Sequence, residues 1–379
     1  MRLGKRLDDR QVVAHVRDIY FRLSENWIHG LVSHLQDWKP IVLTRITQNL
    51  DQVSNIPDYF ARWEDMHGIV RRFDDQAERL LKLYPSEYLV SKWKGVSLVH
   101  AHFGFTGYKY LPLAKALEVP LVTTFYGYDV SRIPQQDPEW LPRYDRLFES
   151  GSAFIAEGPH MKKQLVGLGC PEEKIHVQRI GINTEDYPFQ PRVKKKEPLS
   201  ILMAGRFKEK KGFVDAVKAF AHLHSSGVQA KLTIIGDSDR SNKSKAIKNK
   251  IHNIIKKEKL SKFVNFRGFV PVRELREAYY DHHVFLSPSV EAQNGDNEGG
   301  APVAIIEAQC TGLPVVSTRH CDIPNIVQDG VTGFLSSEGD VPSLSRSLQK
   351  LANHPGEIIS MGQKAHWHIA TYHDVAKAG

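Results

Sequence analysis

The sequence is poor in cysteine and has no long apolar run. Its three cysteines, Cys170, Cys310 and Cys321, are scattered and do not fall at metal-ligand spacing. This argues against a disulfide framework or a cysteine-bound metal and favours a reduced, cytoplasmic setting. No stretch approaches the ~18 apolar residues needed to span a bilayer. The charged start at residues 1–6 has no apolar segment behind it, so we do not expect a secretory signal.

Other signatures are missing as well. No Gly-x-Gly-x-x-Gly follows a predicted strand, which argues against a dinucleotide-dependent oxidoreductase. There is no repeat of fixed period and no low-complexity tract. With 379 residues, 41% of them hydrophobic and 25% charged, the chain has the composition of an ordinary globular protein. It is long enough for two domains, each with its own core.

The net charge of +8 is concentrated in one segment. Residues 240–262 hold nine lysines and arginines against the single acid Glu258, so the rest of the chain is close to neutral. Isoleucines at i, i+4, i+7 and i+8 from Ile247 predict an amphipathic helix with a basic outer face. A solvated surface explains this face best, and attraction to anionic lipid headgroups comes second. Nucleic acid is least favoured, because no aromatic residues are interleaved for base stacking.

Strand-like and helix-like segments alternate in two similar halves. The first half has predicted strands at 11–20, 97–102, 120–125 and 153–156, with a helix over 74–92. The second has predicted strands at 199–204, 231–235, 264–267, 284–286 and 313–318, with a helix over 211–224. This alternation predicts an α/β protein of two doubly wound, Rossmann-like domains facing a central cleft. Ligands in such sheets bind beyond the carboxyl ends of the strands.

Domain boundaries follow from a break in the pattern. Three prolines and a lysine triplet lie between residues 187 and 200, a composition typical of a linker. We therefore expect an N-terminal domain at 1–188, a linker at 189–198 and a C-terminal domain at 199–355. The remaining residues, 356–379, are expected to form a helical segment that packs back toward the N-terminal domain.

The most informative segment is a Gly-Gly-Ala-Pro turn with a carboxylate on each side. Its residues are Glu298, Gly299, Gly300, Ala301, Pro302 and Glu307. Proline suits the first position of a helix, and glycines leave backbone N–H groups accessible. A helix start of this kind binds anions, diphosphate above all. Carboxylates nearby accept hydrogen bonds from sugar and ribose hydroxyls, so the segment predicts a site for a nucleoside diphosphate joined to a sugar.

A pair of cations supports that reading. Arg206 comes just after a predicted strand, and Lys211 lies at the start of the next helix. Both could reach one anion in the cleft. Two fixed cations and a helix start stabilise a departing diphosphate without a metal.

At this point the sequence resembles glycosyltransferase family 4, the retaining, metal-independent group with the GT-B fold. It is most similar to the branch that builds exopolysaccharides such as colanic acid. The resemblance rests on Gly-Arg-Phe at 205–207, Lys-Gly at 211–212, Ile-Ile-Gly-Asp at 234–237, Pro-Ser-Val at 288–290, the 298–307 segment, and the runs at 312–318 and 329–334. The N-terminal domain would then hold the acceptor and the C-terminal domain the nucleotide sugar.

The resemblance implies a role for each matching residue. Arg206 and Lys211 would hold the diphosphate and Glu307 the ribose hydroxyls, while Glu298 and the backbone of the Gly-Gly-Ala-Pro turn would hold the sugar. The family usually places seven residues between the two glutamates, whereas this chain has eight. The extra residue lies before Pro302, so Glu307 keeps its place on the helix and the reach of Glu298 is what changes.

Candidate residues in the N-terminal domain have alternative readings. Tyr126 stands where the family commonly has a histidine, and its phenol can still donate a hydrogen bond to the substrate. His102 would either be structural or touch donor or acceptor, while His100 is expected to be buried on the opposite face of the strand. Asp129 would either bind the acceptor or cap the next helix. For Glu157, capping is favoured over catalysis.

Together these features predict a retaining glycosyltransferase that moves a hexose-type sugar from a nucleotide sugar to a saccharide acceptor. The acceptor would be lipid-linked, at the inner face of the cytoplasmic membrane. The basic helix and the cations Lys5, Arg6 and Arg10 would hold the enzyme there. No metal, cofactor or nucleic acid is expected. The alternative is a non-catalytic protein that binds nucleotide sugars.

Overall fold

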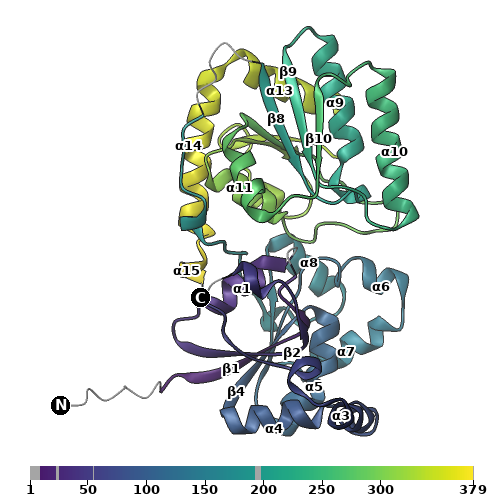
Figure 1. Cartoon of the computed structure of the whole chain (residues 1–379), viewed down its shortest axis with the longest axis vertical. Coiled ribbons are helices and arrows are strands. Elements are labelled where there is room, and N and C mark those ends of the chain that lie inside the picture. Colours follow the sequence, from purple (N-terminus) through teal and green to yellow (C-terminus); the bar gives the residue numbers. More distant parts are fainter. Residues whose placement is uncertain (1–8, 23–24, 54, 193–197, 379) are drawn as a thin grey trace, which may run out of the picture.

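The computed structural model describes residues 9–22, 25–53, 55–192 and 198–378. Two parallel β-sheets lie one above the other in the long direction of the molecule, each with its own helices (Figure 1). Every strand pair within the described residues is parallel, as the alternating pattern predicts. The two-domain α/β prediction is confirmed.

The N-terminal sheet has seven strands in the order β3-β2-β1-β4-β5-β6-β7. Its strands are β1 Gln11–Tyr20, β2 Trp38–Thr47, β3 Asp58–Ala61, β4 Val96–His102, β5 Leu121–Thr124, β6 Ala153–Ala156 and β7 Ile175–Val177. Its helices are α1 Asn26–Ser33, α2 Arg62–Asp65, α3 Gly68–Leu81, α4 Pro85–Lys94, α5 Gly104–Leu117, α6 Arg132–Gln136, α7 Trp140–Ser150 and α8 Pro159–Gly167. A core of aliphatic and aromatic side chains between the sheet and the α5–α7 side holds this domain together.

The C-terminal sheet has six strands in the order β10-β9-β8-β11-β12-β13. Its strands are β8 Leu199–Ala204, β9 Ala230–Ile235, β10 Val264–Gly268, β11 Val284–Ser287, β12 Val315–Thr318 and β13 Gly333–Ser336. The helices are α9 Phe213–Ser225, α10 Asn242–Lys257, α11 Val272–Tyr280, α12 Val303–Cys310, α13 Val341–Asn353, α14 Pro355–Tyr372 and α15 Val375–Ala378. Two apolar clusters fill the two faces of this sheet, as expected for strands buried on both sides.

Several sequence predictions need correction. The helix predicted over 74–92 is two helices, α3 and α4, because Lys82 adopts φ 58° and Pro85 starts a new helix. Four strands were not predicted: the ten-residue β2 and the short strands β3, β7 and β13. Pro302 lies one residue before α12 rather than at its first position. The basic amphipathic helix is confirmed as α10, which begins at Asn242 behind the capping side chain of Ser241.

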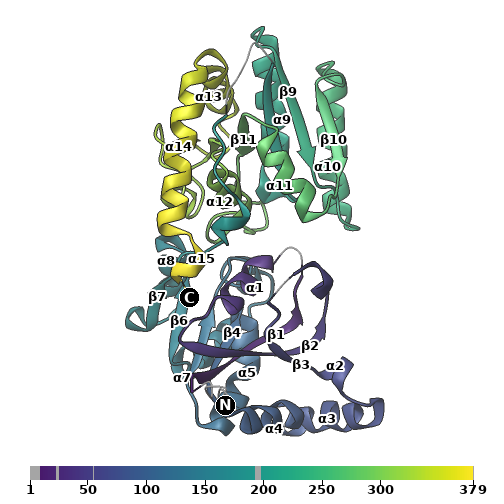
Figure 2. The ribbon, with the colours of Figure 1, turned by 60° about the vertical axis from the view of Figure 1, so that its left-hand side comes forward.

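The end of the chain returns to the N-terminal domain. α14 packs against α12, and the residues after it reach the other domain, as Figure 2 shows for α15. There Asp374 forms a bridge with Ile182, and the Gln36 side chain donates to the carbonyl of Ala376 at 3.2 Å. None of the described helices is long and apolar enough to cross a membrane.

Candidate functional site

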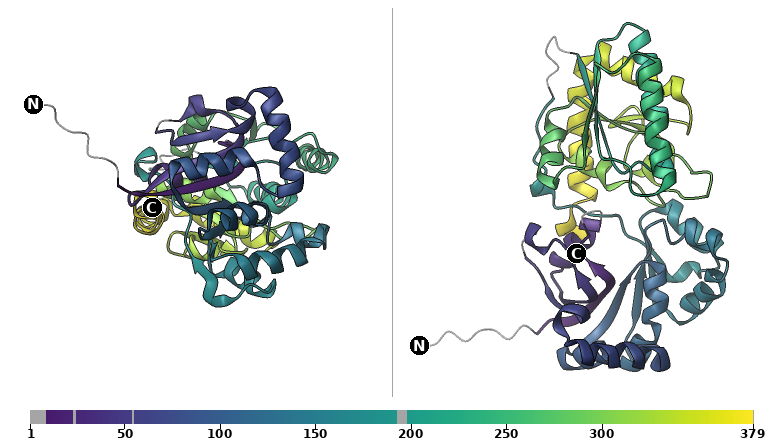
Figure 3. Two further views of the ribbon diagram at one scale, coloured as in Figure 1. Left: turned by 90° about the horizontal axis from the view of Figure 1, so that it is seen from below. Right: turned by 45° about the vertical axis from the view of Figure 1, so that its right-hand side comes forward.

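The two domains face each other (Figure 3), and the Gly-Gly-Ala-Pro turn lies between them, since Gly299 approaches Gly127 of the N-terminal domain. Gly299 has φ +74°, a conformation that favours glycine, and its N–H donates to the Asn297 side chain at 2.9 Å. α12 begins directly after Pro302. The sequence thus builds a helix start at the carboxyl edge of the C-terminal sheet, as anion-binding sites in doubly wound folds require.

Backbone from the N-terminal domain touches this turn. A Cβ added to Gly127, whose φ is +95°, would lie 2.8 Å from the carbonyl carbon of Glu298 and 2.9 Å from the Cα of Gly299. A Cβ on Gly300 would lie 2.9 Å from the Cβ of Glu157. These glycines let the turn pack directly against the backbone of Gly127 and against the side chain of Glu157. The cleft is therefore closed at the turn.

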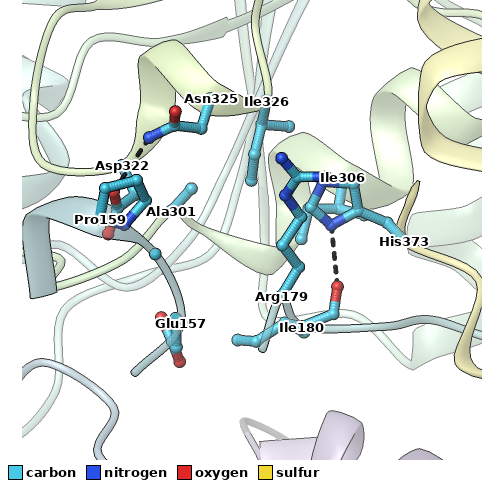
Figure 4. A pocket seen from close by; sticks show the side chains of 11 residues that line it. Glu157, Pro159, Arg179, Ile180, Ala301, Ile306, Asp322, Asn325, Ile326 and His373 are labelled. Atoms are coloured by element: carbon cyan, nitrogen blue, oxygen red, sulfur yellow. Dashed lines mark hydrogen bonds between the residues drawn. The ribbon is translucent and has the colours of Figure 1, made fainter. Parts of the chain in front are cut away.

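A second cross-domain contact comes from Asp322. Its carboxylate accepts from the backbone N–H groups of His160 at 2.8 Å and Met161 at 3.3 Å, so it caps α8 of the other domain. Figure 4 shows Asp322 beside Pro159, with Glu157 pointing away from the start of α8. The favoured reading of Glu157 as a cap is therefore wrong. The cap comes from a residue 162 positions further along the chain, which no local pattern could reveal.

Glu157 instead faces the cleft beneath Gly300. Burial, together with repulsion from Asp129, Asp322 and Glu298, raises the pKa of Glu157 well above its usual range. A carboxyl group in this setting favours its protonated form, which can donate a hydrogen bond. The sequence identifies Glu157 as a candidate but does not show that its side chain faces the cleft.

Four cations gather at the loop between β8 and α9. They are Arg206, Lys208, Lys210 and Lys211. Lys210 binds Asp296 at 3.0 Å and Lys211 binds Glu298 at 3.0 Å, while the Arg206 side chain is exposed. Burial and repulsion from Arg206 and Lys210 lower the pKa of Lys208. Positive charge is therefore in excess here, which favours an anion.

Glu298 is built into this cluster. Besides Lys211, its carboxylate accepts from the Ser289 hydroxyl at 3.0 Å, and its own N–H lies 3.1 Å from the Nε2 of His320. Burial acts to raise the pKa of Glu298, but attraction to Lys211 and Lys210 leaves it below its ordinary value. Glu298 is thus ionised and paired with Lys211, the lysine that is predicted to bind the diphosphate.

Glu307 is held by two phenols. Its oxygens accept from the hydroxyls of Tyr187 at 2.8 Å and Tyr279 at 2.9 Å. Burial raises the pKa of Glu307, and the tyrosine hydrogen bonds offset part of that rise. A carboxylate has about four lone-pair directions. The Asn26 side chain also hydrogen-bonds to Glu307, so one direction remains for a ribose hydroxyl. Neither tyrosine was singled out from the sequence.

Tyr126 and His102 form one hydrogen-bonded chain with His15. The Tyr126 hydroxyl lies 2.7 Å from Nδ1 of His102, whose Nε2 lies 3.0 Å from Nδ1 of His15. Burial and repulsion from His100, His15 and Arg17 lower the pKa of His102 well below its usual value. A neutral His102 that donates to the phenol oxygen leaves the Tyr126 proton free for a ligand. His102 itself is fully buried and reaches the cleft only through Tyr126.

His100 lies beside His102, with ring centroids 4.7 Å apart. The prediction that it points to the opposite face is wrong, since side chains two residues apart on a strand share a face. Ligand atoms of His15, His100 and His102 lie within 4.8 Å of one another. The His15 and His102 rings are, however, joined edge to edge by their 3.0 Å hydrogen bond, which requires a proton on one of the two nitrogens. That nitrogen offers no lone pair to an ion, so in this arrangement the cluster fits a metal poorly.

Asp129 is fully buried, and its carboxylate accepts from backbone N–H groups of Gly104 at 2.7 Å and Tyr126 at 3.0 Å. Burial raises its pKa to about 6. Both oxygens are used to cap α5 and to fix the turn that carries Tyr126. This geometry argues against contact with an acceptor, and the helix that Asp129 caps is the earlier α5 rather than the next helix along the chain.

Two family models match the chain in succession. Residues 24–186 match "Glycosyltransferase Family 4", and residues 184–366 match "Glycosyl transferases group 1". The chain belongs to glycosyltransferase family 4. The two models match the two halves of the chain, in agreement with the two parallel sheets.

Two curated relatives of this family 4 member are named for exopolysaccharide biosynthesis. The amylovoran biosynthesis glycosyltransferase AmsK of Erwinia amylovora is 34% identical over 260 residues, which cover 68% of this chain and 62% of that protein. The putative colanic acid biosynthesis glycosyltransferase WcaL of Escherichia coli is 33% identical over 253 residues, covering 65% and 59%. The matches therefore span about three fifths of these relatives' length.

Solved structures share the fold along nearly the whole chain. Anabaena HepE, crystallised with UDP and glucose, has a TM-score of 0.76 at 17% identity, with 97% of this chain and 96% of that one covered. Sucrose-phosphate synthase from Thermosynechococcus elongatus has a TM-score of 0.75 at 18% identity, with 97% of each covered. At this level of identity the likeness shows the GT-B fold alone.

Proposed function

We propose that this family 4 member is a retaining glycosyltransferase of cell-surface polysaccharide biosynthesis. It transfers a hexose-type sugar from a nucleoside diphosphate to a saccharide acceptor. The observation that carries the proposal is the cluster of cations at residues 206–211 beside the turn that leads into α12, where Lys211 binds Glu298 at 3.0 Å. Two sources of positive potential aimed at one place suit a diphosphate leaving group.

The transfer needs little proton chemistry from the protein. The bond between the anomeric carbon and the departing phosphate oxygen breaks. The acceptor hydroxyl oxygen bonds to that carbon from the same face, and its proton moves to the departing phosphate oxygen. Arg206 and Lys211 stabilise the charge that develops on the diphosphate, and no metal is required for this role.

Other residues orient the donor. Glu307 accepts from a ribose hydroxyl with the lone pair that its three protein partners leave open. Glu298 and the Gly-Gly-Ala-Pro backbone hold the sugar, and Tyr126 donates to it from the opposite domain. The glycine contacts at the turn exclude water from this place, which limits hydrolysis of the donor.

We propose that the acceptor is lipid-linked and that the reaction takes place at the cytoplasmic side of the membrane. The relatives named for amylovoran and colanic acid biosynthesis support this setting. The second candidate is a protein that binds nucleotide sugars without transfer, which the unusual Tyr126 motivates.

A donor panel tests the proposal. UDP-, GDP- and ADP-sugars are screened for a rise in melting temperature, and the best donor is then incubated with membrane-lipid extract. Lys211→Ala and Glu307→Ala should each weaken donor binding and transfer about 10- to 100-fold, the scale of one charged hydrogen bond. Lys218→Ala, an exposed cation paired with Asp215 at 3.3 Å, is the control and should change neither. Donor binding without any turnover would favour the binding protein.

A further inference from the structure

Helix α3 presents its apolar side to solvent. Ile69, Val70, Phe73 and Leu80 recur on one face of the helix and are 61%, 56%, 68% and 83% exposed. The opposite side of α3 packs toward the domain and includes acidic residues. There Asp74 is buried and accepts from the backbone and hydroxyl of Ser86, both at 2.8 Å. An amphipathic helix packed this way leaves its hydrophobic face without a partner in the described structure.

The next helix, α4, also exposes large apolar side chains. On α4, Leu89 is 64% exposed and Trp93 81% exposed, one helical turn apart. Of the eighteen exposed large hydrophobic side chains among the described residues, ten lie within residues 56–93. We call the following set the outer apolar face: Ile69, Val70, Phe73, Leu80, Leu81, Leu89 and Trp93. Such a concentration marks a surface that binds something.

On α3 and α4, acidic side chains pair with the domain, whereas several basic side chains are exposed to solvent. The buried Arg62 binds Glu87 at 2.9 Å and Asp75 at 2.8 Å, which draws these acids toward the domain. Four bases on the same two helices and their connection are exposed: Arg72, Arg79, Lys82 and Lys92. The outer apolar face is therefore accompanied by positive charge.

We propose that the outer apolar face docks the protein on a membrane surface that contains anionic lipid. Phe73, Leu80 and Trp93 enter the boundary between headgroups and acyl chains, and the surrounding bases bind headgroup phosphates. A second copy of the chain fits less well, because a two-fold interface would bring these bases against their own counterparts. The inference deepens the proposed function and rests on it for the acceptor, whereas docking is measured without any transfer.

The basic helix α10 differs from this surface. Its isoleucines point inward, with Ile251 fully buried and Ile255 5% exposed, so it offers charge without an apolar face. It belongs to the other domain (Figure 1). Lys5 and Arg6 lie outside the described residues, and Arg10 donates to the carbonyl of Gln36 at 3.1 Å. The docking surface thus differs from the one that the sequence suggested.

Docking through α3 and α4 fixes the distance of the cleft from the bilayer. The two helices lie at the end of the N-terminal domain away from the C-terminal domain (Figure 2). β4 runs from the end of α4 to His102 behind Tyr126, and its seven residues, at roughly 3.3 Å each, span about 23 Å. An acceptor that already carries several sugars can bridge this gap, whereas a single sugar on a lipid phosphate cannot.

Vesicle binding tests the proposal on the full chain. Sedimentation with neutral phosphatidylcholine vesicles is compared with vesicles that also contain phosphatidylglycerol. The wild type should bind the anionic vesicles, and the double variant Phe73→Ser with Trp93→Ser should bind them at least about tenfold more weakly, since two large apolar side chains are lost. Trp367→Ser with Tyr372→Ser, which removes two other exposed aromatics, is the matched control and should bind as the wild type does.

Two further variants separate charge from insertion. Arg72→Gln with Arg79→Gln should lose the preference for anionic vesicles, whereas Lys250→Gln with Lys256→Gln on α10 should keep it. The proposal is overturned if the Phe73 and Trp93 variant binds normally, if the α10 variant loses binding, or if light scattering shows that the Phe73 and Trp93 change converts a dimer into a monomer. Donor-induced melting shifts measured on the same variants should be unchanged. Vesicle binding without any donor shift would leave docking intact and refute the proposed function.

Discussion

Closure of the two domains depends on Gly127, which has no room for a side chain. A methyl group there would lie 2.8 Å from the carbonyl carbon of Glu298, about 0.6 Å short of the 3.4 Å at which ordinary contact begins. The atoms opposite are backbone, so they cannot rotate away. The two loops must move apart, and this separates Tyr126 from the Gly-Gly-Ala-Pro turn. We predict that Gly127→Ala opens the cleft.

The magnitude follows from the displacement. A misplacement of about 1 Å at a reacting centre costs roughly 100-fold in rate, so a shift of at least half that size predicts a loss of about tenfold or more in transfer. Each tenfold loss corresponds to ~1.4 kcal/mol of activation free energy. Separately, alanine at positive φ destabilises the fold by about 1–2 kcal/mol.

Gly227 supplies the control for this strain. Its φ is +84°, and a Cβ there has nothing within 4 Å. Gly227→Ala should therefore lower the melting temperature about as much as Gly127→Ala but leave transfer unchanged. The assay is the rate of sugar transfer at saturating donor, with small-angle scattering to follow closure. Equal transfer rates in the two variants would refute the reasoning.

Three further predictions follow from the contacts. Asp322→Ala should lose about 1 kcal/mol of unfolding free energy and also weaken transfer, whereas Asp340→Ala, which removes the cap of α13 within one domain, should lose only stability; similar transfer in both would contradict a role in closure. Tyr126→Phe should slow transfer about tenfold or more while Tyr126→His keeps it, and a fully active phenylalanine variant would exclude the phenol as a donor. Burial lowers the pKa of His100 from 6.5 to about 4, so the unfolded chain binds more protons between these values and stability rises with pH through this window. Urea unfolding should show about 2 kcal/mol less stability at about pH 5 than at about pH 8 from this group, and His100→Gln should reduce the difference.

Much of the fold could be predicted from local pattern. β1 was placed at its observed bounds, and β8, β9 and α10 within a few residues, because apolar periodicity and capping residues act locally. The short edge strands β3, β7 and β13 carry too few residues for a clear period. Each of these strands forms by pairing with a neighbouring strand, and local sequence does not show where that neighbour lies.

The candidate site likewise has residues that could be predicted from the sequence and residues that could not. Arg206, Lys211 and the Gly-Gly-Ala-Pro turn could be found because each sits at a strand end or helix start, where chain direction alone fixes its edge of the sheet. Glu157 could not be assigned, because its direction depends on Asp322 taking over the cap of α8. The tyrosines on Glu307 were missed since they come from 120 and 28 residues away.

The sequence by itself determined the family, the two parallel sheets, and where the cations and the Gly-Gly-Ala-Pro turn lie along the chain, since these depend on residue type and short-range order. Only the tertiary structure decided which groups meet across the cleft and which face of a helix is left uncovered. The outer apolar face shows the reason. The pattern of α3 predicts an amphipathic helix in either orientation, and the contacts of the buried Asp74 with Ser86 and of Asp75 with the buried Arg62 turn its apolar side outward.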